Sequence, residues 1–162
     1  MAIKALGNRQ GETKFTSEDR PVVNSVTVTD GDFVKLTSGR VTNATIGTGK
    51  LYAVVQGGAS SDLTSRVYRN MTATGDAAGT VTALVQLVED QIFDLPVSAA
   101  LASDAEGSYY SLTGSTGAQT VDNTTKSATA GQLLCLKRIA DAAGAFTRGQ
   151  FTVSNVASDT SA

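Results

Sequence analysis

The chain contains no histidine and no tryptophan, and only one cysteine and two prolines among its 162 residues. Histidine is the commonest general base and a frequent metal ligand, so its absence excludes Ser-His-Asp and Cys-His catalytic arrangements. The single cysteine, Cys135, excludes an intrachain disulfide and a metal site built from several thiolates. These absences predict that the protein is not an enzyme and uses no cofactor and no metal.

Charge and long apolar runs are sparse as well. The 13 Lys and Arg residues stand against 15 Asp and Glu residues, a formal net charge of −2, which predicts no nucleic-acid partner. No stretch approaches the roughly 18 apolar residues of a membrane span, so no membrane partner is expected. The first residues lack the apolar run of a secretory signal, which predicts synthesis in the cytoplasm.

Short apolar-polar alternations separated by glycine turns fill most of the chain. In residues 26–29 valine alternates with threonine, the two-residue period of a half-buried strand. Asp30-Gly31 is expected to reverse the chain, since Gly accepts positive φ and Asp tolerates it. Strands at 33–36, 40–46 and 50–56 would complete a four-stranded antiparallel meander.

The rest of the chain shows the same pattern and predicts an all-β protein. Further strands are expected at 67–71, 80–89, 92–95, 109–112, 118–121, 133–139 and 149–153, with a loop at 122–131. Residues 98–106 are the one helix candidate, because Ser98 can cap a helix, alanines and a leucine follow, and Gly107 can end it.

The predicted organisation is an extended N-terminal arm at 1–21, a single β domain at 22–154 and a flexible C-terminal tail at 155–162. The first segment is polar and without a stable period, as expected either for a frayed terminus or for an arm that orders on a partner. In the second case Phe15 would be an apolar anchor, and Arg9, Lys14 and Arg20 would be ionic anchors.

Residues 80–89 are apolar on both faces of the expected strand. Such a strand is either central and buried on two sides, or it faces another subunit. Under the second interpretation the subunit interface consists of Val81, Val85, Leu87 and Val88. Under the first interpretation the same residues are ordinary core.

Two stretches share one pattern. Residues 30–37 and 106–113 both read acid-Gly-x-aromatic-x-x-Leu-Thr and are followed by a glycine turn and another strand. Either two hairpins use the same turn and core chemistry, or the match arises by chance from residues that are common in this chain.

Three stretches offer weak candidate sites for chemistry. Asp30 and Asp32 flank a glycine as in a calcium loop, but the following residues supply no further oxygen ligands. The stretch 47–50 lacks the full phosphate-loop spacing and a following helix. The acids within 89–106 could catalyse glycoside hydrolysis only if the fold brought two carboxylates together. The aromatic residues that would bind a sugar ring are also few in this chain. We interpret these as turns and solvated acids, and Cys135, between two leucines, as an inert core thiol.

The hairpin motifs at 28–36, 49–57, 92–95, 105–112 and 131–134 resemble those of the capsid cement, or head decoration, proteins of tailed bacteriophages. The resemblance covers roughly Val22 to Phe151. It implies an antiparallel β-barrel or β-tulip-like domain with an extended N-terminal arm, and a homo-oligomer, with a trimer favoured.

The resemblance also implies a function and a partner. Such a protein is made in the host cytoplasm, binds the major capsid protein on the outer surface of the virion head, and stabilises the shell without doing chemistry. The capsid-binding arm would then use Arg9, Lys14, Phe15 and Arg20. Two alternatives remain open: another β-module of the virion, such as a tail tube, head fibre or baseplate component, or a cell-surface binding module.

Overall fold

The structure is a computed structural model that describes residues 4–8, 16–44, 47, 49–59 and 72–157. Within these residues all regular structure is β and there is no helix, so the prediction of an all-β protein is confirmed. The strands are β1 (Lys4–Asn8), β2 (Ser17–Pro21), β3 (Thr27–Thr29), β4 (Phe33–Thr37), β5 (Arg40–Asn43), β6 (Ala53–Ala59), β7 (Thr72–Thr74), β8 (Thr82–Leu87), β9 (Gln91–Pro96), β10 (Tyr109–Thr113), β11 (Thr120–Ser127), β12 (Leu133–Ile139) and β13 (Arg148–Val153).

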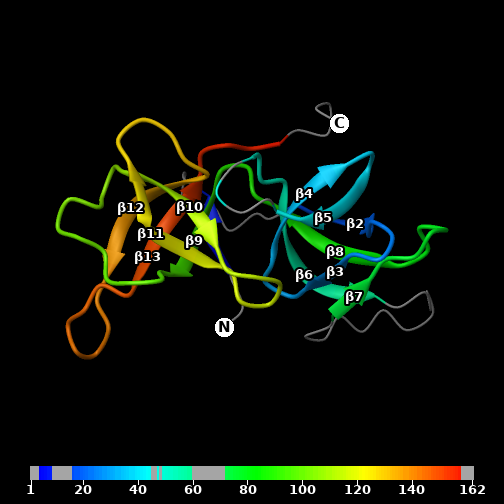
Figure 1. Cartoon of the computed structure of the whole chain (residues 1–162), viewed down its shortest axis with the longest axis horizontal. Helices are drawn as coiled ribbons and strands as arrows, with labels where there is room; N and C mark the ends of the chain where they lie inside the picture. The colour runs from blue at the N-terminus through cyan, green and yellow to red at the C-terminus, as the bar shows by residue number, and fades with distance from the viewer. Residues whose placement is uncertain (1–3, 9–15, 45–46, 48, 60–71, 158–162) are drawn as a thin grey trace.

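The strands form three antiparallel sheets. A six-stranded sheet has the order β1-β9-β13-β12-β10-β11, a five-stranded sheet has the order β2-β8-β6-β4-β5, and β3 pairs with β7 alone. Figure 1 shows strands β9 to β13 in one half of the molecule and the five-stranded sheet with β3 and β7 in the other. In the described part of the chain none of the three sheets closes into a barrel.

The two large sheets repeat one strand order. Taken along the chain, β2, β4, β5, β6 and β8 hold the same places in their sheet as β9, β10, β11, β12 and β13 hold in theirs. We call the first set, with its connections, the first unit and the second set the second unit. Strand β1 is an additional strand that lies outside β9 at the edge of the second unit.

The core consists of two clusters. One contains most buried side chains of the second unit together with five from the first unit, Phe33, Ala44, Leu51, Val54 and Val88. The rings of Phe33 and Phe93 meet there edge to face, with centroids 5.3 Å apart. The other cluster belongs to the first unit, and the neighbouring residues Phe33 and Val34 enter different clusters because they point to opposite faces of β4. The first unit's sheet is therefore buried on both faces.

The predicted meander at 26–56 is wrong in its pairing. The turn at Asp30-Gly31 does form, with Gly31 at φ 87° and the Asp32 N–H donating to Thr29 O at 2.9 Å. However, β3 pairs with β7, and β6 takes the edge of β4 that β3 was expected to occupy. Only the β4–β5 hairpin of the meander exists. Local alternation indicates which residues are strands but does not select among possible partners.

The helix expected at 98–106 is absent, and turns lie there instead. Its backbone donors bond to distant segments: Ser98 N–H to Val121 O at 2.8 Å and Leu101 N–H to Phe146 O at 2.9 Å. Leu101 and Ala105 are buried in the second unit's core, so tertiary packing overrides the local preference for helix. The loop expected at 122–131 is also wrong, because the polar edge strand β11 extends to Ser127.

Both predicted terminal segments contain residues that pair within the domain. Residues 4–8 and 17–21 are extended, as expected for an arm, but they lie in the two large sheets as β1 and β2. Val156 bridges to Leu51, and the Ala157 N–H donates to Leu51 O at 2.8 Å. The strand predicted at 67–71 and residues 158–162 lie outside the described residues.

Candidate functional site

Of the four residues predicted for a capsid-binding arm, Arg9, Lys14 and Phe15 lie outside the described residues. Arg20 lies in β2, where its Nε donates to Glu18 Oε1 at 2.8 Å. The guanidinium also lies over the ring of Tyr52, 5.7 Å from the centroid, close enough for a cation–π contact. Arg20 therefore has a structural role at the edge of the first unit.

The carboxylate of Glu18 is shared between Arg20 and the hydroxyl of Tyr52, which donates a short hydrogen bond to it. Burial, followed by the neighbouring Glu18 carboxylate, raises the pKa of Tyr52 to about 12. The hydroxyl therefore stays protonated at neutral pH and acts as a donor. These three side chains fasten β2 to the segment before β6, and none is arranged as a general base.

The predicted subunit interface is partly wrong. Val85 and Val88 are fully buried in the chain's own core, Val85 in the first unit's cluster and Val88 against the second unit. Val81 and Leu87 are half-buried and pack on the first unit's cluster. Because the sheet has core on both faces, Val85 and Val88 cannot contact another subunit in this conformation. The interpretation of this strand as core is the one that the structure supports.

A buried carboxylate lies where the two units meet. Asp32 is 1% exposed, and its carboxylate accepts from the Thr29 N–H at 2.9 Å and the Gly117 N–H at 2.7 Å. Burial raises the pKa of Asp32 despite these two hydrogen bonds. Next to it, Gln119 Oε1 accepts from the Phe33 N–H at 2.7 Å, and Gln119 Nε2 donates to Phe33 O at 3.2 Å. The second unit's turn is thus bonded to the start of β4.

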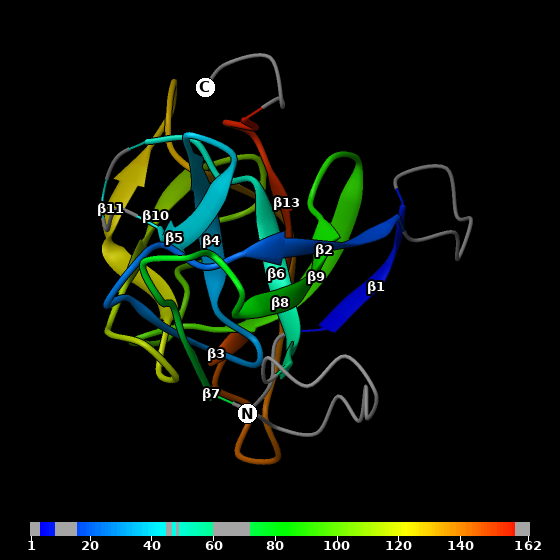
Figure 2. The same ribbon diagram turned by 90° about the vertical axis from the view of Figure 1, so that its right-hand side faces the viewer.

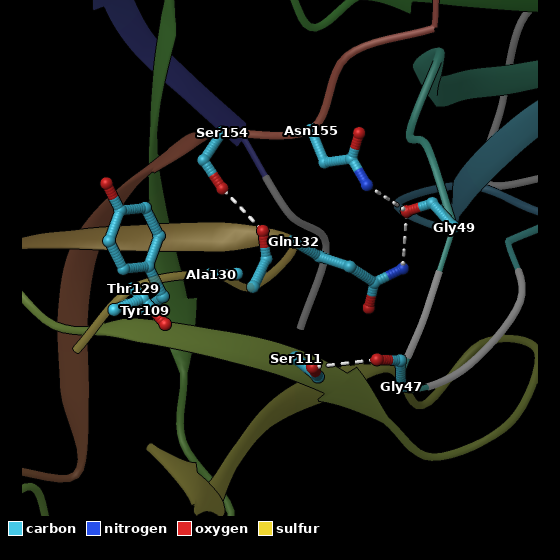
Figure 3. A pocket seen from close by; sticks show the side chains of 10 residues that line it. Gly47, Gly49, Tyr109, Ser111, Thr129, Ala130, Gln132, Ser154 and Asn155 are labelled. Carbon is cyan, nitrogen blue, oxygen red and sulfur yellow. Dashed lines mark hydrogen bonds between the residues drawn. The ribbon is translucent and has the colours of Figure 1, made fainter. Parts of the chain in front are cut away.

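A cavity of about 540 Å³ also lies between the units (Figure 3). Three of its polar side chains bond to backbone carbonyls of the first unit: Ser111 Oγ donates to Gly47 O at 2.9 Å, and Gln132 Nε2 and Asn155 Nδ2 each donate to Gly49 O at 3.3 Å. Among the described residues that line the cavity, none is charged. This described lining consists of small residues and neutral polar groups.

The single cysteine is a buried thiol. Burial, with a smaller effect of Glu106, raises the pKa of the Cys135 thiol to about 11, so the thiol stays protonated, as the sequence predicted. Among the described residues no cluster of three or more Cys, Asp or Glu could hold a metal ion. Nor does the described part of the chain contain a helix long and apolar enough to cross a membrane.

No protein-family model, no curated protein and no solved structure matches this chain.

Sequence analysis missed the residues that join the units. Gln119 and Gln132 are 7% and 1% exposed, and each side chain bonds to a backbone group of the first unit, Gln119 to Phe33 and Gln132 to Gly49 O. A glutamine within a polar turn or after a glycine is normally exposed, so the sequence carried no signal for their burial. Asp32 was identified only as a turn residue, because its partner Gly117 lies 85 positions away.

Proposed function

We propose that this chain is a structural, non-catalytic protein that decorates the outside of a tailed-bacteriophage head and stabilises the shell by binding the major capsid protein. One observation supports the proposal that the protein is not a catalyst: at the junction between the units, the buried polar side chains form hydrogen bonds with the chain's own backbone. Asp32, Gln119 and Gln132 each hold a backbone group of another segment. The resemblance of the hairpin motifs supplies the class of protein.

We further infer that each unit is an incompletely closed β-barrel and that the chain assembles as a homotrimer. In support of the barrel, a parallel bridge joins Val22, just after β2, to Val41 in β5. An equivalent bridge joins Val97, just after β9, to Val121 in β11. Each bridge links the two ends of the strand order in its unit.

The stabilising mechanism is mass action. A ligand that binds only the assembled, expanded lattice stabilises that lattice by about 2.7 kcal/mol per site when its free concentration is 100 times Kd. Many sites acting together then oppose the internal pressure of the packaged DNA. Arg9, Lys14 and Phe15 are proposed as contacts with the capsid, whereas Arg20 would contribute only while keeping its bond to Glu18.

Co-sedimentation of the purified protein with expanded heads and with unexpanded procapsids of the phage that encodes it tests this function. We expect saturable binding to expanded heads only, weakened by the combined substitution of Arg9, Lys14 and Phe15 to alanine. Lys137→Ala, at an exposed position of β12, is the control and should bind normally. Absence of binding to either particle would refute the proposal, and rings or tubes formed by the protein alone would favour a tail component.

A further inference from the structure

The two units match residue by residue in their strand pairing. Taken along the chain, the fourth and fifth strands of each unit, β6–β8 and β12–β13, pair in the same register. Both pairs have the same irregularity, between Val55 and Gly57 in one unit and between Cys135 and Lys137 in the other. We therefore infer that the chain is a tandem duplication of one five-stranded unit.

The equivalence extends to residues that border these strands. The N–H groups of residues 88 and 154, which follow the fifth strand of each unit, donate to the carbonyls of residues 52 and 132 at 3.2 and 2.9 Å. Three pairs of residues are thereby equivalent: Phe33 and Tyr109, Leu51 and Gly131, and Val88 and Ser154.

These equivalent residues form a different face in each unit. In the first unit Phe33, Leu51 and Val88 are fully buried in the core cluster that most of the second unit's buried side chains share. Figure 2 views the molecule from the side of the first unit, and the strands of the second unit lie behind it. In the second unit, by contrast, Tyr109 and Gly131 are half-buried and Ser154 is exposed. This face of the second unit is therefore less apolar and less covered than its duplicate.

The cavity between the units lies at this face of the second unit. Tyr109, Gly131 and Ser154 all line it. The first unit has the large apolar side chains of Leu51 and Val88 at the places of Gly131 and Ser154. Position 131 cannot take a leucine in this conformation, because a Cβ there would lie 2.8 Å from the Cβ of Tyr109. Small residues in the second unit thus leave a hollow where the first unit is filled.

Several polar groups of the lining have no partner within the described part of the chain. The hydroxyls of Tyr109 and Thr129 form no hydrogen bond there. Asn155 uses its Nδ2 on Gly49 O, and its Oδ1 accepts no hydrogen bond from a described residue. Uncharged donors and acceptors of this kind suit the hydroxyl and amide groups of a neutral ligand. A charged ligand would find no charged partner among the described lining residues.

The walls of the cavity are held in place without a ligand. Ser111 Oγ donates to Gly47 O at 2.9 Å across the junction, and Ser154 Oγ donates to Gly131 O at 2.6 Å. Figure 3 shows Tyr109 and Thr129 on one side of the cavity and the glycines 47 and 49 on the other. A pre-formed cavity binds a ligand with a smaller cost in ordering the protein.

We propose that the cavity between the units binds a neutral sugar residue. The hydroxyls of the sugar form hydrogen bonds with Tyr109, Thr129 and Asn155, and the ring of Tyr109 gives an apolar surface to the C–H groups of the sugar. The volume of about 540 Å³ lies within the range of about 300–1,000 Å³ that is usual for small-molecule sites.

The first unit uses the equivalent face to pack against protein, which offers a different explanation of this surface. However, two of the three buried apolar side chains of that face, Leu51 and Val88, are replaced here by Gly131 and Ser154. A hollow lined by small residues, hydroxyls and amides lacks the apolar area that drives the burial of one protein surface on another. The lining therefore favours a small polar ligand.

Titration of the full-length, ¹⁵N-labelled protein with methyl glycosides of glucose, galactose, mannose and N-acetylglucosamine, followed by NMR, tests the proposal. We expect at least one of these glycosides to cause saturable shifts of the backbone amides of residues 109–111, 129–132 and 154–155. Methyl glucuronide, the charged counterpart of the methyl glucoside, should bind no more tightly, because no described lining residue is charged.

Substitutions separate the proposed contacts from the fold. Tyr109→Phe, Thr129→Val and Asn155→Ala should each weaken binding about two- to tenfold, as expected for the loss of one hydrogen bond. The matched control is Tyr110→Phe, in the same strand, because Tyr110 is buried in the core and its hydroxyl has no hydrogen-bond partner among the described residues. This variant should bind like wild type.

Four outcomes would overturn the proposal. Absence of saturable shifts with every glycoside would indicate a cavity that holds water only. Tighter binding of the glucuronide would contradict a neutral ligand, and unchanged affinity in all three variants would contradict the contacts. Shifts of the same amides on raising the protein concentration without sugar would identify a second copy as the occupant. Capsid co-sedimentation does not enter these outcomes, so the two proposals fail independently.

Discussion

Removing the side chain of Gln119 is expected to destabilise the junction between the two units. The amide spans both backbone groups of Phe33, accepting from its N–H at 2.7 Å and donating to its carbonyl at 3.2 Å. The carbonyl keeps a second donor, the Ala44 N–H at 3.1 Å, so the main loss concerns the Phe33 N–H. A buried N–H without a partner costs about 1–3 kcal/mol.

For Gln119→Ala we expect a loss of about 2 kcal/mol in the free energy of unfolding, and a Tm lower by about 4–8 °C for a chain of this size. Gln119→Met keeps most of the volume but removes the amide, and it should lose a similar amount. Ser115→Ala, exposed in the same turn, is the matched control and should stay within about 0.5 kcal/mol of wild type. Equilibrium denaturant unfolding and calorimetry measure all three. Wild-type stability of Gln119→Met would show that volume, not the hydrogen bonds, matters there, and would refute the reasoning.

Three further predictions concern pH, reactivity and turn geometry. Burial raises the pKa of Asp32 above its usual 3.8, so ionisation of this carboxyl lowers the stability of the folded protein as the pH rises through the raised pKa. Between about pH 4 and pH 7, Asp32→Asn should therefore lose less stability than wild type in denaturant titrations. A larger loss in the variant would contradict the assignment. Cys135 should resist a thiol reagent at pH 8 in the folded protein and react once guanidinium unfolds it; fast native labelling would show an accessible thiolate. Gly114→Ala should destabilise more than Gly107→Ala, because both glycines have positive φ but only at Gly114 would a Cβ meet a backbone oxygen, Ala118 O at 2.2 Å; equal thermal shifts would contradict this.

The sequence was sufficient for the fold class and for most strands, because alternation and glycine turns are local signals. The strand predicted at 133–139 has those bounds in the structure, and β9, β10 and β13 differ from prediction by a residue at one or both ends. Partner choice was not predictable, since β3 and β6 both suit the same edge of β4. The candidate site was predicted least well, because it depends on contacts such as Asp32 with Gly117 that only the duplicated arrangement creates.

The repeated pattern at 30–37 and 106–113 is the part of the duplication that sequence analysis detected. The structure makes these stretches equivalent: Phe33 lies opposite Val54 and Tyr109 lies opposite Leu134, at the same places in the two units. The rest escaped detection because the units accommodate different insertions. Strands β3 and β7, which pair only with each other among the described strands, belong to the first unit alone. The connection that contains β7 runs over residues 60–81 between β6 and β8, whereas the second unit has only residues 140–147 between β12 and β13.

The core residues have changed in step with these insertions. Val34 and Val85 of the first unit correspond to Tyr110 and Phe151 of the second, whose rings meet edge to face at 6.0 Å. In the first unit the smaller side chains share their cluster with Val28 of β3 and Ala73 of β7. In the second unit the larger ring constrains its neighbour, since a Cβ at Gly149 would lie 2.7 Å from the Phe151 ring, whereas the first unit has Ala83 at that position. Strand pairing and most of the register are therefore the same in the two units while side-chain volume is distributed differently, as close packing requires of two cores built on one strand order.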